Sequence, residues 1–283
     1  MKKMLTIVAT MSGLLVGAVS ATTTQASSVK LASGYLDEMK VFSNGFVTTK
    51  KSIKTDLYRK INGKKVRYTI PKGATVGVAT TGYTESNGKL KTTVSLNLSN
   101  QSYKFRKSFT TFNKKHGYWI KTDNIALKSS TFKLAKSTAK NKYSDLVFER
   151  GSAFNYPNRK KATGLFNITD DGYVQYYDSQ AVKKSGYEDG LWNQNIYQLK
   201  PTATQKISKI RRDGHVTYFY YNHPINGLKE YKVGKSTYRL KINLQNHDGN
   251  KTWVTKNDLI NANWQNYHVG GKSYYVINNI DSE

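Results

Sequence analysis

Apolar and polar residues alternate with a period of two along much of this chain, which predicts β-strands that bury one face. Two clear examples begin with Gly-Lys turns, in the stretches GKLKTTVSLNLSN (88–100) and GKSTYRLKINLQN (234–246). After each comes a stretch with a Trp and a later Asp, HGYWIKTDNIAL (116–127) and NKTWVTKNDLIN (250–261). Two pairs of stretches that match in the same order indicate a repeated small β unit.

Short Asn-Gly, Gly-Gly and Asp-Gly signals divide these stretches and predict turns, because such residues adopt positive φ angles readily. We expect hairpins at Asn62-Gly63, Asn226-Gly227 and Gly270-Gly271. At Asp170-Asp171-Gly172 we expect a turn that precedes a strand.

The aromatic content supports the same fold class. The chain has 21 Tyr, 10 Phe and 4 Trp but only 4 Pro, which favours strands over helices. We expect Trp119 and Trp253 to close two hydrophobic cores rather than to stack on a ligand, because a large indole buries much apolar area.

The Trp stretches resemble the last strands of bacterial SH3-like (SH3b) modules of cell-wall proteins, which commonly have Gly-x-x-Gly-Trp-Val before a polar pair and Asp-Leu. INGKKVRYTIPKGATVGV (61–78) and VGGKSYYVINN (269–279) resemble the surface-layer anchoring domains of lactobacilli. The units of that family read Asn-Gly-Lys-x-x-Tyr, followed by a strand and a Lys-Gly turn. These resemblances imply small barrels. We therefore expect an all-β protein with two small SH3-like β-barrel modules that flank an atypical central segment.

Changes in composition give the expected boundaries. Residues 129–144 are rich in Ser, Thr and Lys and suggest a linker, and acidic residues gather in the segment after it. The predicted organisation is a signal peptide at 1–26, a leader at 27–49, a first module at 50–128, the linker at 129–144, the central segment at 145–200, and a second module with a C-terminal hairpin at 201–283.

The first residues predict export. Lys2 and Lys3 precede an apolar run, and small residues after it allow cleavage after Ala21 or Ala26. A retained membrane anchor is a weaker alternative, because the run is short and rich in small residues. The chain has no Cys, which excludes a disulfide scaffold, a lipidated cysteine and a thiol nucleophile. We expect a secreted, cell-wall-associated protein with no membrane contact after cleavage.

Charge gives the strongest functional indication. The chain has 45 Lys and Arg against 18 Asp and Glu, a formal net charge of +27. A field of this size attracts polyanions, and an anionic cell-wall polymer is the expected partner. Nucleic acid would bind only incidentally, because the protein is exported. The alternative is that the lysines only keep the protein soluble.

Cations alternate with aromatic residues between Tyr103 and Lys107, so a strand there would present aromatic residues on one face and cations on the other. This segment and the Asn62-Gly63 hairpin supply the candidate polyanion-binding residues. The cations are Lys64, Lys65, Arg67, Lys104, Arg106, Lys107, Lys114 and Lys115, and the aromatic contacts are Tyr103 and Phe105.

Enzyme chemistry has weak support. Asp170 and Glu188 are the one carboxylate pair that we would test as acid and base, although Asp before Gly is ordinary turn chemistry. A calcium site at Asp170, Asp171 and Asp178 has the wrong spacing for a helix-loop-helix loop. The five His form no zinc motif. We expect no catalytic activity, no metal and no cofactor.

The expected function is non-catalytic binding of teichoic acid or peptidoglycan through a basic, aromatic-rich surface. An adhesin for a host glycan or protein is the alternative, and a cell-wall hydrolase is a more remote one.

Overall fold

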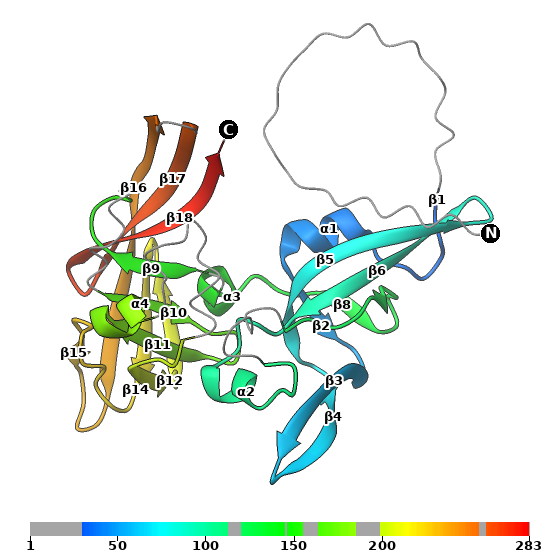
Figure 1. The fold of residues 1–283 in the computed structure, drawn as a ribbon, viewed down its shortest axis with the longest axis horizontal. Helices are drawn as coiled ribbons and strands as arrows, with labels where there is room; N and C mark the ends of the chain where they lie inside the picture. The colour runs from blue at the N-terminus through cyan, green and yellow to red at the C-terminus, as the bar shows by residue number, and fades with distance from the viewer. Residues whose placement is uncertain are drawn as a thin grey trace, which may run out of the picture. The chain divides into compact units, whose positions relative to one another are not determined.

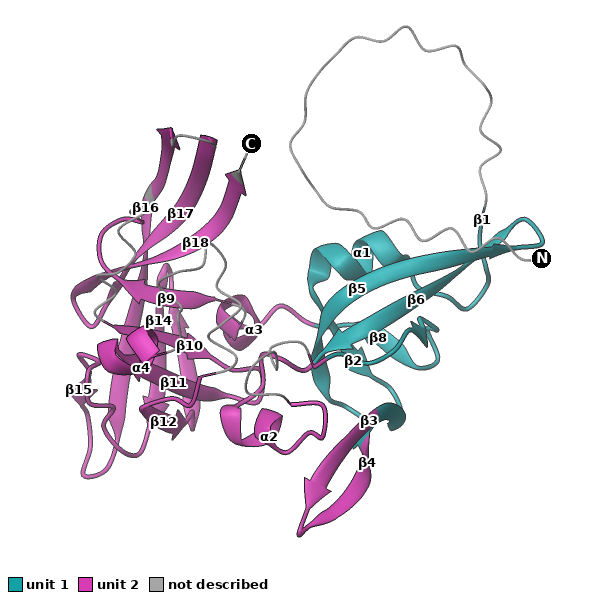
Figure 2. Cartoon of the chain, in the orientation of Figure 1, with its two compact units in different colours: residues 1–56, 69–97, 121–135 teal, residues 57–68, 98–120, 136–283 magenta. Residues whose placement is uncertain are grey.

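The computed structural model describes residues 30–112, 120–144, 146–154, 164–184, 199–254 and 259–282. Strands dominate, and the helices among these residues are short, so the all-β prediction is confirmed (Figure 1). The described residues fall into two compact units, and each unit is built from several separate segments of the chain. Unit 1 takes its residues from 1–56, 69–97 and 121–135, and unit 2 from 57–68, 98–120 and 136–283 (Figure 2).

Unit 1 is built on a six-stranded sheet with the order β1-β6-β5-β2-β8, in which β7 also pairs with β6. Strand β1 runs parallel to β6, and the other pairs are antiparallel. The elements are β1 (Lys30–Leu31), α1 (Glu38–Asn44), β2 (Phe46–Thr49), β5 (Thr75–Ser86), β6 (Lys89–Asn97), β7 (Ile125–Ala126) and β8 (Phe132–Leu134).

The predicted leader at 27–49 is wrong, because residues 30–49 contribute β1, α1 and β2 to unit 1. The Asp37 carboxylate accepts hydrogen bonds from the backbone N–H groups of Met39 and Lys40 and so caps α1, which ends at Gly45 with a φ of 70°. Val47 of β2 is fully buried between β5 and β8. The helix and strand are too short to give a clear period in the sequence.

Within the described residues, three hairpin turns have positive φ at both central residues, at Asn62-Gly63, Asn87-Gly88 and Gly270-Gly271. This is the type I′ geometry that suits twisted strands. One joins β3 (Ile53–Ile61) to β4 (Lys64–Ile70), with φ values of 49° at Asn62 and 78° at Gly63. Gly270 and Gly271 join β17 to β18 in the same way, as predicted. Asn226-Gly227 is different, because it lies in a loop where the Leu228 N–H donates to the Ile225 carbonyl.

Unit 2 contains a ten-stranded antiparallel sheet with the order β12-β11-β10-β9-β18-β17-β16-β14-β13, and β15 also pairs with β16. Its strands are β9 (Val147–Arg150), β10 (Gly164–Ile168), β11 (Tyr173–Asp178), β12 (Ala203–Lys206), β13 (Lys209–Asp213), β14 (Val216–Tyr221), β15 (Tyr231–Lys232), β16 (Tyr238–Val254), β17 (Leu259–Val269) and β18 (Lys272–Ser282). Its helices are α2 (Tyr103–Lys107), α3 (Ala139–Ser144) and α4 (Ser179–Lys184).

The two outermost strands of this sheet, β12 and β13, are joined only by residues 207 and 208. The Ile207 N–H donates to the Gly172 carbonyl beside β11, and the Ser208 N–H donates to the Tyr220 carbonyl of β14. Both ends of the sheet therefore meet at this linker, and the sheet curls into a half-barrel. The main core lies inside the curl and includes Phe148, stacked on Phe166 at 4.6 Å between ring centroids.

This topology corrects the predicted boundaries. Residues 129–144 are not a linker, because they contribute β8 to unit 1 and α3 to unit 2, where Tyr143 is 1% exposed. Residues 145–200 are not a separate segment, because β9 pairs with β18 and β11 pairs with β12. The sequence could not show these pairings, since each strand's alternation is the same whichever partner it has.

The predicted repeat is present as strands but not as matched units. Its two Gly-Lys strands are β6 and β16, but Trp253 lies at the far end of β16 itself, whereas Trp119 lies outside the described residues. Trp253 is half-buried and packs edge-on against Phe154 at 5.5 Å. The buried indole of that cluster belongs to Trp264, so Trp253 borders a core rather than closing it.

Candidate polyanion-binding site

The tip of the β3–β4 hairpin belongs to unit 2 and has two different faces. Side chains alternate along each strand, so Arg59 and Tyr68 lie on one face, with the Arg59 guanidinium carbon 5.8 Å from the Tyr68 ring centroid. Lys65 lies on the other face, with its Nζ 4.5 Å from the Tyr58 ring centroid. The first face packs against the segment that carries α2, and the second is left for solvent.

An aromatic cluster anchors the inner face of the hairpin. The rings of Tyr68, Phe105 and Phe109 meet edge to face with centroids 5.2–5.5 Å apart. The Arg59 guanidinium carbon lies 4.6 Å from the Phe105 centroid, and its Nε donates to the Ser108 hydroxyl at 2.6 Å. Burial in this cluster raises the pKa of the Tyr68 phenol, although Arg59 opposes the shift.

Backbone hydrogen bonds reinforce this packing. The Lys60 N–H donates to the Ser108 carbonyl at 2.7 Å, and the Thr110 N–H donates to the Tyr58 carbonyl at 2.9 Å. The segment after α2 thus pairs with β3 in place of a third strand. An isolated two-stranded hairpin is marginally stable in water, so these contacts hold its cations in place.

The segment before α2 is in turn fixed to the sheet by the Asp170-Asp171-Gly172 turn. The Asp171 carboxylate accepts from the Ser102 N–H at 2.8 Å and from the Ser102 hydroxyl at 2.6 Å. The Asp170 N–H donates to the Asn100 carbonyl at 2.9 Å. The predicted turn is confirmed, with a φ of 78° at Gly172, and its carboxylate positions the α2 segment.

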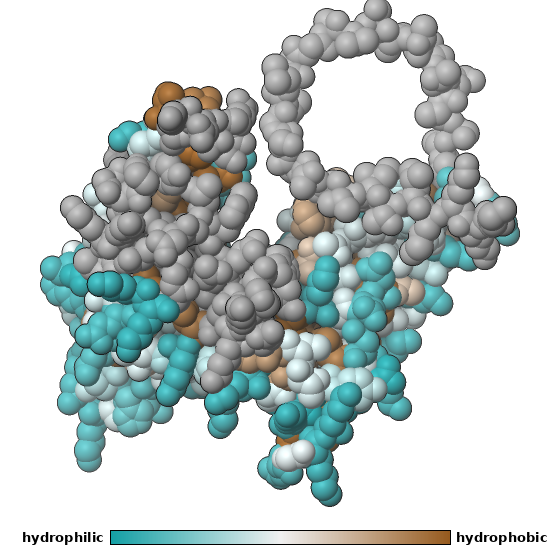
Figure 3. All heavy atoms as spheres, viewed as in Figure 1, coloured by the Kyte–Doolittle hydropathy of each residue, from teal (hydrophilic) through white to brown (hydrophobic). Residues whose placement is uncertain are grey.

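Exposed cations cover the outside of this assembly. Residues 57–68 and 98–112 contain eight Lys and Arg and no Asp or Glu. Figure 3 shows hydrophilic side chains over the hairpin. Six of the eight cations are exposed: Lys60, Lys64, Lys65, Arg67, Lys104 and Lys107. We call these six residues the hairpin surface.

The structure corrects part of the predicted site. The segment Tyr103–Lys107 is the helix α2 and not a strand, so aromatic residues and cations do not separate onto two faces. Arg106 is fully buried, and its Nε donates to the Gln101 carbonyl at 2.8 Å. Phe105 packs under the hairpin. Alternation over five residues does not distinguish a strand from a single helical turn.

The remaining predicted residues divide into three groups. Lys64, Lys65, Arg67, Lys104 and Lys107 are exposed, and so is Lys60, which is not among the predicted residues. Tyr103 is half-buried, with its ring 5.9 Å from the Phe112 ring. Lys114 and Lys115 lie outside the described residues.

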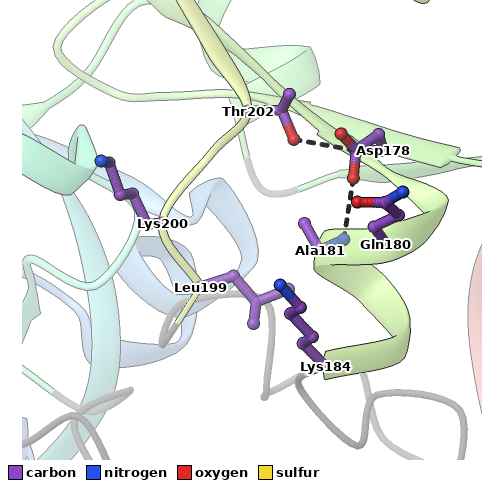
Figure 4. A pocket seen from close by; sticks show the side chains of 7 residues that line it. All are labelled: Asp178, Gln180, Ala181, Lys184, Leu199, Lys200 and Thr202. Atoms are coloured by element: carbon purple, nitrogen blue, oxygen red, sulfur yellow. Dashed lines mark hydrogen bonds between the residues drawn. The ribbon is translucent and has the colours of Figure 1, made fainter.

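Asp171 and Asp178, two of the carboxylates considered for a calcium site, have structural roles. Asp178 accepts from the Ala181 N–H at 2.8 Å and caps α4, beside a hollow of about 370 Å³ whose lining includes Lys184 and Lys200 (Figure 4). Asp170 is buried, and Glu188 lies outside the described residues. Within the described part of the chain, no three His, Cys, Asp or Glu side chains gather to hold a metal ion.

No protein-family model, curated protein or solved structure matches this chain. The resemblance to SH3-like wall modules therefore stays a prediction. Across the described residues, no helix is long and apolar enough to span a membrane.

Proposed function

We propose that this protein is a secreted, non-catalytic binder of anionic bacterial cell-wall polymers, teichoic acid or peptidoglycan, and that it acts at the cell wall. The observation that carries the proposal is the hairpin surface, where six exposed cations lie on two segments, 57–68 and 98–112, that contain no acidic residue. These segments supply no carboxylate of their own to offset the positive charge, and an external polyanion reduces the self-repulsion that it causes.

The mechanism follows from the character of the cations. Most are lysines, whose compact, strongly hydrated charge on a flexible stem does not demand one ligand geometry. A wall polymer with many equivalent phosphates offers many equivalent positions to such side chains. Binding then releases condensed counterions, so affinity falls steeply as salt rises.

The test measures sedimentation of the full chain with purified walls at rising salt, with and without teichoic acid. The hairpin variant Lys60→Gln, Lys64→Gln, Lys65→Gln and Arg67→Gln removes four charges. Its matched control, Lys89→Gln, Lys91→Gln, Lys121→Gln and Lys133→Gln, removes four exposed charges from unit 1. Arg106 is left unchanged because it is buried.

We expect the hairpin variant to bind at least tenfold more weakly at low salt than the control does. Its plot of log affinity against log salt should be flatter by about 3, because each contact contributes about 0.7 on a flexible chain. Circular dichroism should show both variants folded, since exposed charges contribute little to stability. Wall binding that persists in 0.5 M salt, or equal loss in both variants, contradicts the proposal and favours an adhesin.

A further inference from the structure

Strand β14 has aromatic residues on both of its faces. Phe219 and Tyr221 are fully buried in the core inside the curl, together with Leu240 of β16. Because side chains alternate, Tyr218 and Tyr220 lie on the opposite, outer face, where both are half-buried. The outer tyrosines are not needed to fill the core.

The register of the sheet places cations on both sides of these two tyrosines. Tyr220 pairs with Lys209 of β13 and with Arg239 of β16, and Tyr218 pairs in the same way with Arg211 and Lys241. Strands lie about 4.8 Å apart and alternate residues about 7 Å apart. The Cα atoms of the four cationic residues thus lie at the corners of a rectangle of roughly 7 by 10 Å.

Ring contacts order two of these cations, Arg239 and Lys209. The Arg239 guanidinium carbon lies 5.0 Å from the Tyr218 centroid and 5.7 Å from that of Tyr231, which pairs with Arg239 from β15. The Lys209 Nζ lies 5.8 Å from the Tyr220 centroid. Cations held over rings lose less freedom when an anion binds.

The local charge is strongly positive. Asp213 is the only acidic residue within the strand segments 209–213, 216–221, 231–232 and 238–243. It lies at the end of β13, with its carboxylate 3.6 Å from the Arg211 guanidinium, and both side chains are mostly exposed. A single screened contact of this kind leaves the other three cations without a carboxylate on these strands.

We propose that this outer face, with Lys209, Arg211, Arg239 and Lys241 around Tyr218 and Tyr220, is a second anion-binding site that takes a phosphodiester-linked polyol chain. Such a chain carries a charge in its backbone at every repeat, which suits four cations within one small rectangle. A single-stranded nucleic acid fits less well, because base stacking needs ring faces that the cations already cover. The site rests on the proposed function for its ligand class, but it uses different residues.

The experiment titrates the full chain with poly(glycerol phosphate) at several salt concentrations. The sheet-face variant is Lys209→Gln, Arg211→Gln and Lys241→Gln. Its matched control is Lys229→Gln, Lys232→Gln and Lys235→Gln, which removes three exposed charges from the neighbouring loop and β15. We expect about tenfold weaker binding and a salt slope flatter by about 2 for the sheet-face variant relative to the control.

The other outcomes separate this site from the proposed function. If the hairpin variant loses binding while the sheet-face variant matches its control, the second site is wrong and the proposed function stands. If the wild-type chain does not bind poly(glycerol phosphate), the phosphodiester ligand class fails. Binding of a dT oligonucleotide that is tighter than binding of the polyol polymer, and lost in the sheet-face variant, replaces the proposed ligand with a single-stranded nucleic acid.

Discussion

The hairpin surface and the outer face of β13, β14 and β16 use the same residue types in opposite ways. On the hairpin, Tyr68 faces inward with Phe105 and Phe109, and the cations face solvent. On the sheet, Tyr218 shares the outer face with its cations. A two-stranded hairpin needs its apolar face for anchoring, whereas a strand inside a broad sheet is already held by its buried face and its neighbours.

The largest difference should appear when one ring is removed from the core that holds the sheet and one from the cluster that anchors the hairpin. Phe148 is fully buried inside the curl, so Phe148→Ala should lower the free energy of unfolding of unit 2 by about 3–5 kcal/mol. Phe105 is half-buried under the hairpin, so Phe105→Ala should cost only about 1–2 kcal/mol. Denaturant unfolding followed by tyrosine and tryptophan fluorescence measures both. Equal losses of unfolding free energy would mean that the aromatic cluster under the hairpin stabilises the unit as much as the core inside the curl does.

A smaller difference in stability should separate glycine substitutions in the turn of the β3–β4 hairpin from those in the β17–β18 turn of the sheet. An added Cβ at Gly270 would lie 1.7 Å from the Lys229 carbonyl oxygen, whereas one at Gly271 or at Gly63 meets no atom within 4 Å. All three have positive φ, which costs a residue with a side chain about 1–2 kcal/mol. Gly270→Ala should add overpacking of about 1–3 kcal/mol to that strain.

The matched substitution in the same turn is the control for this prediction. The melting temperature of Gly270→Ala should be well below that of Gly271→Ala, and that of Gly63→Ala should be close to that of Gly271→Ala. If Gly270→Ala and Gly271→Ala had the same melting temperature, the close approach of the Lys229 carbonyl would not constrain the turn.

The sequence predicted the strands better than their partners. Alternation and turn residues located the β3–β4 hairpin at Asn62-Gly63 and the strands that became β6, β16 and β18. The pairing of β9 with β18 joins Glu149 to Tyr275, and no local pattern encodes a contact across that separation. The short elements α1 and α2 were missed, because one or two helical turns give too few residues to show a period.

For a related reason, the sequence indicates the exposure of the candidate residues only in part. Exposure follows from residue type, so the exposed positions of Lys64, Lys65, Arg67, Lys104 and Lys107 agree with the sequence, and their role in binding stays a prediction. The burial of Arg106 could not be foreseen, because it depends on packing between α2 and distant strands. Arg59 was missed, since its contacts with Phe105 and Ser108 arise only when the hairpin meets α2.

The smallest predicted effect concerns alkaline pH. Burial raises the pKa of the Tyr274 phenol to about 12, with a further contribution from Tyr176 that Arg150 partly opposes. A group whose pKa is higher in the folded state stabilises the fold fully below its unfolded pKa of about 10 and loses that contribution as pH rises towards 12. At pH 11 the loss from this residue should be about 1 kcal/mol.

Burial also raises the pKa of Tyr176, Tyr177, Tyr221 and Tyr267 in the curled sheet, and that of Tyr68 in the hairpin. Unfolding of unit 2 should therefore become easier between pH 10 and 12, as measured by urea unfolding at fixed salt. The variant Tyr274→Phe keeps the ring and removes the titrating hydroxyl, so its stability should fall less steeply over the same range. Identical slopes for the variant and the wild type would show that Tyr274 ionises as readily in the folded chain as in the unfolded one.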